Sequence, residues 1–198
     1  MAKKGPRMCI RHLRALAPVV GGLVLAGAVG AGLLATLGLY NIAADAPHLA
    51  LTRQFISYVR ERSIAVRAAS VVVPDLSGKQ MIAEGASDYQ AMCTGCHLAP
   101  GMAENEMRPG MNPKPPQLAS IPALAPATQF WIIKHGIKMT GMSAWGVTHS
   151  DQEIWNMVAF LQRLPSLSPQ QYHALTSASA GHHEHDEHQD SMKMDMGH

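Results

Sequence analysis

The chain opens with a long apolar segment that predicts a membrane-crossing helix. No Asp, Glu, Lys or Arg occurs over residues 15–44, which are rich in Gly, Ala, Leu and Val. About 20 helical residues are enough to cross the ~30 Å hydrocarbon core of a bilayer. Five basic residues and no acidic residue precede the segment, which predicts a cytoplasmic N-terminus by the positive-inside rule. We therefore expect a cytoplasmic segment over residues 1–14, a transmembrane anchor over residues 15–44, and export of everything that follows.

A cleaved signal peptide is the alternative for this segment, because it has the same basic start. The apolar region of a signal peptide runs about 7–15 residues, and the uncharged segment is about twice as long. This length favours a retained anchor, with Tyr40 well placed at the membrane interface. Both interpretations export the rest of the chain, and for a bacterial protein they predict a periplasmic domain; the anchor predicts a single pass through the inner membrane.

Beyond the anchor, residues 45–74 are predicted to form a linker that contains an amphipathic helix over residues 47–69. Apolar residues recur there near helical spacing, with arginines between them. The apolar positions are Leu51, Phe55, Tyr58, Val59 and Val66, and the arginines are Arg53, Arg60, Arg62 and Arg67. Such a helix is either a solvated spacer or a surface that docks on a partner or on lipid headgroups.

Residues 75–169 are predicted to form a compact all-α domain. Helical patterns cover residues 79–92, 127–136 and 151–164, and a Pro- and Met-rich loop covers residues 100–126. Ser150 and Glu153 have the spacing of a capping box, in which each side chain satisfies a backbone N–H of the other residue. Apolar residues then form one stripe along the last helix until Pro165 ends it.

The last segment, residues 170–198, has the composition of a disordered tail. From residue 181 it contains His, Met and acidic residues and no aliphatic side chain larger than Ala, so it cannot bury a core. Imidazole and thioether groups suit copper, and a solvated tail is the alternative. The candidate copper ligands are His182, His183, His185, His188, Met192, Met194, Met196 and His198.

Composition limits the classes of function. Charged residues are 15% of the chain, against about 25% in soluble proteins, and the apolar segment accounts for much of the deficit. A net charge of +2 argues against a basic nucleic-acid-binding protein. Three cysteines and 5% aromatic residues argue against a disulfide-rich scaffold and against a large aromatic core. A non-protein group that fills part of the core would explain the low aromatic content.

The strongest chemical signal is Cys93-Thr94-Gly95-Cys96-His97. A Cys-x-x-Cys-His sequence is a c-type haem attachment motif, in which the two thiols form thioethers with the haem vinyl groups and the histidine binds the iron. The alternatives are a thioredoxin-like redox pair and half of a zinc site. The first would need a βαβ pattern that the sequence lacks, and the second would need a further cysteine pair, whereas only Cys9 remains.

A second axial ligand is expected if the iron carries electrons, and methionine is a common choice that raises the reduction potential. Met139 and Met142 lie in a loop bracketed by glycines just before the last predicted helix. The other candidates are Met102, Met107, Met111, His135 and His149. Four basic residues, Arg108, Lys114, Lys134 and Lys138, are candidates for haem propionate partners or a docking rim, with a solvated surface role as the more ordinary expectation.

The region from about Glu84 to Pro165 resembles a class I c-type cytochrome. Gly85 and Tyr89 precede Cys93 by eight and four residues, as a glycine and an aromatic residue do in that family, and Pro115-Pro116-Gln117-Leu118 resembles its segment after the haem histidine. The resemblance implies that the last helix crosses at Gly85 and offers an aromatic residue there, Phe160 or alternatively Trp155. It also implies that the Pro116 carbonyl orients His97 and that Leu118 packs on the haem.

The same resemblance implies a distal ligand. Gly141-Met142-Ser143-Ala144-Trp145 is similar to the family's Gly-Met-Pro-Ala-aromatic loop except at Ser143. Met142 is therefore the expected ligand, with Met139 as the second choice. The expected fold is an all-α class I cytochrome c fold around one covalent haem c, preceded by one transmembrane helix.

The expected function is that of a membrane-anchored electron carrier with redox partner proteins and no catalysis of its own. The alternatives are a haem subunit of a larger membrane dehydrogenase or oxidase, an enzyme or sensor with an open haem, and a copper-linked redox protein that uses the tail.

Overall fold

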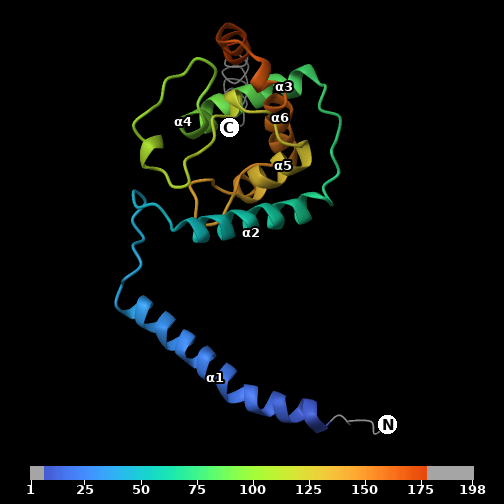
Figure 1. The fold of residues 1–198 in the computed structure, drawn as a ribbon. Coiled ribbons are helices and arrows are strands. Elements are labelled where there is room, and N and C mark those ends of the chain that lie inside the picture. The colour runs from blue at the N-terminus through green and yellow to red at the C-terminus, as the bar shows by residue number, and fades with distance from the viewer. Residues whose placement is uncertain (1–6, 178–198) are drawn as a thin grey trace, which may run out of the picture. The chain divides into compact units, whose positions relative to one another are not determined.

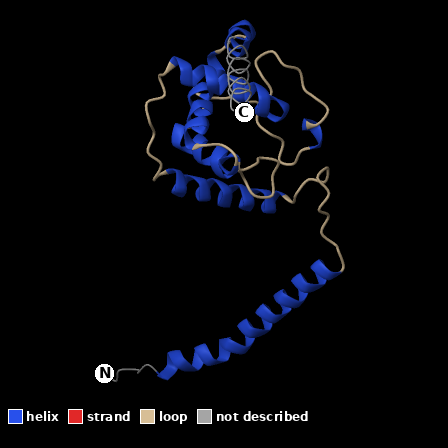
Figure 2. Cartoon of the chain, turned by 180° about the vertical axis from the view of Figure 1, so that it is seen from behind, coloured by secondary structure: helices blue, strands red, loops and turns tan. Residues whose placement is uncertain are grey.

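The computed structural model describes residues 7–177 of the chain, and within this range it contains helices, turns and loops but no strand (Figures 1 and 2). The chain divides into two compact units, one ending at Ala46 and the other beginning at Pro47. The expectation of an all-α protein is confirmed. Each unit is described separately below.

The first unit contains one helix, α1 (Arg7–Thr36). Its stretch Leu16–Thr36 has a mean hydropathy of 2.0, which makes it long and apolar enough to cross a membrane. The helix ends with the hydrogen bonds of a Schellman motif, from the N–H of Leu39 to the carbonyl of Leu34 and from Gly38 to Ala35. Gly38 has a φ of +62°, a conformation that glycine adopts without steric cost.

The bounds of the helix differ from those of the uncharged segment, and the anchor boundaries stay a prediction. The uncharged segment covers residues 15–44, but α1 begins earlier, at Arg7, and ends at Thr36. Gly38 is the physical reason for the earlier end, because its left-handed backbone turns the chain out of the helix. Residues 37–44 are uncharged but belong to the segment that follows the helix.

The second unit contains the remaining described helices. The labelled α-helices are α2 (Ala50–Ala68), α3 (Lys79–Asp88), α4 (Thr94–His97), α5 (Pro126–His135) and α6 (Asp151–Leu161), and residues 169–177 are helical as well. A π-helical turn (Tyr89–Cys93) joins α3 to α4, and 3₁₀ turns cover Arg108–Gly110, Leu118–Ser120, Trp145–Val147 and Leu164–Ser166. The helix expected over residues 79–92 is thus divided, and the helix expected over residues 151–164 ends at Leu161.

Helix α2 packs against α5 (Figure 1), but not through the apolar residues that the sequence pattern picked out. Its buried residues are Ile64 and Ala68, whereas the five predicted apolar positions are all exposed. The prediction of a helix is confirmed, and its role as a solvated spacer or a docking surface stays a prediction. A helical period shows that two faces differ, and it does not show which of them has a neighbour.

The core of the second unit lies where α3 crosses α6. A Cβ atom at Gly85 would lie 1.9 Å from the carbonyl oxygen of Asn156, so only glycine permits this close approach of the two backbones. One turn further on, the ring of Tyr89 lies 5.4 Å from the ring of Phe160. Phe160 is therefore the aromatic residue at the crossing, and Trp155 instead stacks on Phe130 of α5 at 4.1 Å.

Helix α6 begins with the predicted capping box. The Ser150 hydroxyl accepts a hydrogen bond from the backbone N–H of Glu153 at 3.3 Å, and Glu153 Oε2 accepts one from the backbone N–H of Ser150 at 2.7 Å. Eight consecutive residues of the helix, 154–161, are buried. The cap therefore fixes the residue at which α6 begins, and α6 itself forms the centre of the core.

The compact domain continues past its expected end at residue 169. Residues 169–177 are helical, and Tyr172 is 1% exposed. Its hydroxyl donates a hydrogen bond to Gln90 Oε1 at 2.6 Å, and its ring lies 6.1 Å from that of Phe160. The expectation that disorder begins at residue 170 is wrong, because a buried tyrosine ties residues 169–177 to the core.

Candidate haem-attachment site

The two cysteines and the histidine of the motif lie on one helical segment. A π-helical turn brings the chain to Cys93, and α4 carries Cys96 and His97. The Thr94 hydroxyl donates to the Gln90 carbonyl at 2.9 Å, and the Tyr89 hydroxyl donates to the Leu98 carbonyl at 2.5 Å. These bonds hold the motif against the helix crossing, with both thiols half-buried and free.

The ring of His97 is oriented by the backbone of a distant loop. Its Nδ1 atom lies 2.9 Å from the carbonyl oxygen of Pro116. A carbonyl only accepts, so Nδ1 carries the proton and Nε2 has a free lone pair. Burial lowers the pKa of His97, against an opposing effect of the Pro116 bond, which favours the neutral imidazole that metal ligation needs.

Leu118 lies two residues after Pro116, as the resemblance requires. It begins the 3₁₀ turn Leu118–Ser120 and packs, half-buried, against the core cluster. The contact of Pro116 with His97 and the packing of Leu118 are thus present, and their roles toward a haem stay predictions.

A buried arginine in the loop after the motif binds the backbone of α4; we call Glu104, Asn105 and Arg108 together the brace. Arg108 is 1% exposed, donates from Nη1 to the Cys96 carbonyl, and donates from Nε to Glu104 Oε1 at 3.0 Å. Lys114 Nζ lies 3.0 Å from the same carboxylate oxygen. Hydrogen bonds from Lys114 and then Arg108 hold the pKa of Glu104 below its usual value, so this carboxylate stays charged.

Asn105 completes the brace. Its Nδ2 donates to the Gly95 carbonyl at 2.6 Å, and its Oδ1 accepts from the backbone N–H groups of Met107 and Arg108 at 3.2 and 3.1 Å. The more ordinary expectation for Arg108, a solvated surface role, is therefore wrong, because its side chain is buried. The backbone carbonyls of Gly95 and Cys96 need hydrogen-bond donors, because α4 is too short to supply them. The loop supplies one donor to each, Asn105 to Gly95 and Arg108 to Cys96.

Met142 and Met139 differ sharply in their surroundings. The Met142 side chain is half-buried and packs against the core cluster, whereas Met139 is 98% exposed. The Met142 carbonyl accepts from the Ile137 N–H at 3.1 Å, and its own N–H donates to the Thr140 hydroxyl at 3.1 Å. A Cβ at Gly136, whose φ is +63°, would lie 2.7 Å from the Met142 carbonyl oxygen, so the loop is closely packed behind this methionine.

The other candidate axial residues have partners or positions that fit an axial role less well. His135 is exposed and its ring lies 4.9 Å from that of Trp131. His149 Nδ1 lies 2.9 Å from the Thr148 hydroxyl, and its ring lies against Trp145. Met102 and Met107 are about half exposed, and the Met111 methyl lies beside Gly141.

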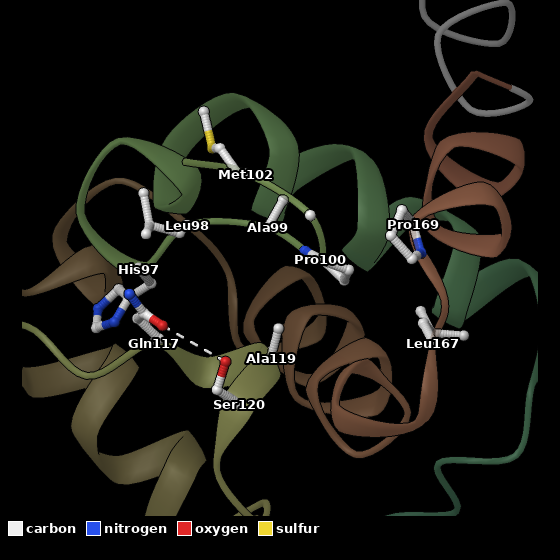
Figure 3. A pocket seen from close by; sticks show the side chains of 11 residues that line it. His97, Leu98, Ala99, Pro100, Met102, Gln117, Ala119, Ser120, Leu167 and Pro169 are labelled. Carbon is white, nitrogen blue, oxygen red and sulfur yellow. Dashed lines mark hydrogen bonds between the residues drawn. The ribbon is translucent and has the colours of Figure 1, made fainter. Parts of the chain in front are cut away.

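A pocket of about 280 Å³ lies beside the motif (Figure 3). Its lining includes His97, Pro100 and Met102 together with Leu167 and Pro169 from the C-terminal segment. Neither the two cysteines nor Leu118 and Met142 line it. The pocket is therefore a surface hollow between the residues after the motif and the C-terminal segment, and it is not the space between the two candidate axial residues.

The residues present fit a c-type haem better than the two alternatives. Over residues 7–177, no three His, Cys, Asp or Glu side chains gather where they could hold a metal ion, so a zinc site lacks its ligands. The described chain also has no strand for a thioredoxin-like pair. Burial, with smaller effects of Asp88 and Cys96, raises the pKa of Cys93 to about 12, opposite to the lowered pKa of a redox-active thiol.

The comparisons with known proteins agree with this geometry. Residues 80–161 match the model of a protein family described as cytochrome C oxidase, cbb3-type, subunit III. This domain is a class I c-type cytochrome. No curated protein and no solved structure gave a significant match to the chain. The cytochrome domain makes the protein a haem-binding electron-transfer cytochrome, with haem c as its cofactor.

Sequence reasoning found the motif residues but missed the brace around them. Glu104 and Asn105 were not singled out, because single acidic and amide residues in a loop carry no spacing signal. The only hint was that Glu104 and Arg108 are four residues apart. The candidate copper ligands, from His182 to His198, lie outside the described residues.

Proposed function

We propose that this chain is a membrane-anchored monohaem cytochrome that carries single electrons between redox partners on the periplasmic side of the bacterial inner membrane. Cys93 and Cys96 would hold the haem covalently, and His97 and Met142 would be the axial ligands. The observation that carries the proposal is the bond between His97 Nδ1 and the Pro116 carbonyl, because it fixes the ring and leaves the Nε2 lone pair free as a metal ligand.

The bound haem supplies a one-electron Fe(III)/Fe(II) couple. The protein contributes ligands, orientation and a low-dielectric surrounding. His97 keeps a fixed tautomer through Pro116, Leu118 supplies apolar packing, and the loop around Met142 holds a thioether at a half-buried position. Filling both axial positions from the chain leaves none open for a substrate, as electron transfer requires.

Replacement of Met142 tests the ligand assignment. We expect Met142→Ala to lose the weak Met-to-iron band at the red end of the ferric spectrum, to bind CO readily, and to have a lower reduction potential, because thioether ligation raises it. The matched control is Met139→Ala, which removes an exposed thioether from the same loop and should leave the spectrum unchanged. Retention of the red band in Met142→Ala would refute the assignment.

The anchor and its direction rest on α1 and on the five basic residues before the apolar segment. If the proposal is correct, the purified protein keeps its N-terminus, remains with membranes after an alkaline wash, and is degraded by protease added from the periplasmic side only. A mature N-terminus near residue 45 would instead show a cleaved signal peptide.

A second candidate function is that of a haem subunit in a larger membrane enzyme. It is favoured by the matched family, which is described as an oxidase subunit. Purification in mild detergent distinguishes the two functions. A stable complex with other membrane proteins favours the subunit, and a single chain that exchanges electrons in solution favours the carrier.

Copper binding by the tail is a separate prediction from composition. Deletion of residues 181–198 should remove copper affinity and leave the haem spectrum unchanged. Unchanged copper affinity in the shortened chain would dispose of this role.

A further inference from the structure

Helix α2 exposes its most apolar face. Leu51 is 78% exposed, Phe55 66% and Tyr58 64%, and Val59 and Val66 are exposed as well. At about 100° of rotation per residue, these five positions share a sector of about 100°. We call them the exposed stripe. The stripe lies roughly opposite Ile64 and Ala68, the two buried residues of the helix.

The exposed stripe has no partner within the described part of its own unit. Helix α2 packs on α5, and only two residues of α2, Ile64 and Ala68, are buried. A helix on the surface of a soluble protein normally turns its polar face to water, and contiguous apolar patches on such surfaces mark protein or membrane contacts. The stripe therefore needs a covering that this unit does not provide.

Arginines occur along the whole length of the helix. Arg53, Arg60 and Arg67 are spaced by seven residues, so they form one row, about 150° around the helix from the centre of the stripe and on the side of Ile64. Arg62 lies within the sector of the stripe itself. With Glu61 as the only acidic residue of α2, the helix has a net charge of +3.

The row is partly ordered by local contacts. Arg67 Nη1 donates to the carbonyl and hydroxyl oxygens of Ser63 at 2.9 and 2.7 Å. Arg60 lies 3.5 Å from Glu61, and both side chains are substantially exposed. Arg53 and Arg62 are exposed. Most of the positive charge is thus accessible to an anionic surface.

The chain itself brings such a surface within reach. The candidate membrane span ends at Thr36 and α2 begins at Ala50, so thirteen residues connect them. Fully extended, these residues reach about 45 Å at most. If α1 crosses a membrane, α2 is always close to that membrane. This favours a lipid surface over a protein as the covering.

We propose that α2 is an interfacial helix, with the exposed stripe inserted at the boundary of headgroups and acyl chains, Arg62 bound to lipid phosphates, and the charge of the arginine row attracting the helix to an anionic surface. A helix with a basic polar side and Leu and Phe on its apolar side lies in the interface plane. Because α2 also packs on α5, binding would hold the haem domain at the membrane surface. Electron exchange would then favour partners in or on the same membrane.

The test uses the full haem-loaded chain with Cys9→Ser, in which the thioethers occupy Cys93 and Cys96. A nitroxide spin label is attached at Val59→Cys on the stripe or, as the matched control, at Gln54→Cys, which is exposed on another side of the same helix. The proteins are incorporated into lipid nanodiscs with or without phosphatidylglycerol. Collision rates with oxygen and with a water-soluble nickel chelate report the depth of each label.

We expect the oxygen-to-nickel ratio at position 59 to be several-fold higher than at position 54 in anionic nanodiscs. The difference should shrink in zwitterionic nanodiscs and in the combined variant Arg53→Gln, Arg60→Gln, Arg67→Gln. Equal nickel access at both positions in anionic nanodiscs would overturn the proposal. Protection of position 59 only after another membrane protein is added would also overturn it, in favour of a protein interface.

The proposal uses the anchor of the proposed function, and the experiment separates their failures. A chain that does not enter nanodiscs lacks the anchor, and co-sedimentation of the same labelled chain with anionic vesicles then decides the role of α2. Sedimentation that the three arginine replacements abolish supports an interfacial helix, and no sedimentation refutes it. The optical spectrum of each sample reports separately on the haem.

Discussion

At the scale of single residues, a buried arginine holds the haem motif in place. Arg108 donates to the Cys96 carbonyl and to Glu104, and its guanidinium is almost fully excluded from water. A buried arginine is tolerated only where its N–H groups are satisfied. These contacts indicate that Arg108 holds α4 in place. Helix α4 is where the thioethers and the iron ligand would need the correct spacing.

We predict that Arg108→Leu lowers the free energy of unfolding by about 2 kcal/mol, because two hydrogen bonds to a charged group are lost and the Cys96 carbonyl loses its donor. The measurement is urea unfolding followed by circular dichroism. Lys114→Gln is the control, since it removes the exposed partner of the same carboxylate and should cost less than about 1 kcal/mol. Equal losses in the two variants would contradict the bracing role.

At the scale of elements, the crossing of α3 and α6 depends on one missing side chain. The Gly85→Ala variant would place a methyl group 1.9 Å from the Asn156 carbonyl oxygen and 2.8 Å from the Met157 nitrogen. Backbone atoms cannot rotate away, so the two helices must separate. We expect a loss of about 3 kcal/mol, at the upper end of overpacking costs.

The matched control for this prediction is Gly110→Ala, where an added Cβ would meet nothing within 4 Å. Its stability should change by less than about 1 kcal/mol. Thermal unfolding of the haem-loaded proteins measures both variants. An unchanged melting temperature in Gly85→Ala would show that the two helices have room for a methyl group at their crossing.

The start of α6 offers a prediction with a pH dependence. Hydrogen bonds from the Ser150 hydroxyl and then its backbone N–H lower the pKa of Glu153. A carboxyl with a lowered folded pKa stabilises the fold above its unfolded pKa, and this stabilisation is lost as the pH falls through the folded pKa. Ser150→Ala should therefore cost about 1 kcal/mol at neutral pH and less below about pH 4.

Chemical unfolding at a series of pH values measures this dependence. The control is Ser166→Ala, which removes a hydroxyl bonded only to a nearby carbonyl and should show no such trend. A cost for Ser150→Ala that stays constant with pH would mean that the Glu153 side chain takes no part in the cap.

At the scale of the whole molecule, the C-terminal segment closes the cytochrome domain. Tyr172 packs on Tyr89 and Phe160 and donates to Gln90, 82 residues earlier. Because Tyr89 and Gln90 lie just before the first haem cysteine, the described C-terminal residues bear directly on the haem motif. The domain therefore extends beyond the segment 80–161 that the family model matches.

We predict that Tyr172→Ala lowers the free energy of unfolding by about 3–5 kcal/mol, as expected for removal of a buried aromatic ring. Tyr172→Phe keeps the ring and loses only the bond to Gln90, and it should cost about 1 kcal/mol. Guanidinium unfolding measures the difference. Similar small losses in both variants would show that the C-terminal helix only rests on the surface of the domain.

What the sequence by itself determined is local. The haem motif, the capping box and the apolar span each depend on residues within one turn or one segment, so their spacing carries the information. Recognition of Pro116, Leu118 and the pair Tyr89 and Phe160 needed more than periodicity, namely a resemblance to a known family. The structure brings Pro116 to His97 across nineteen residues.

Only the tertiary structure decided which faces are covered. The sequence shows that α2 has an apolar stripe, but only the structure shows that α5 packs on the other side, at Ile64 and Ala68. Arg108 looks like a surface residue, yet the Glu104 carboxylate and the Cys96 carbonyl, twelve residues earlier, make its burial possible. Tyr172 looks like part of a polar tail, yet it completes the core. Burial depends on what the rest of the chain brings near a residue, and a linear pattern does not contain that information.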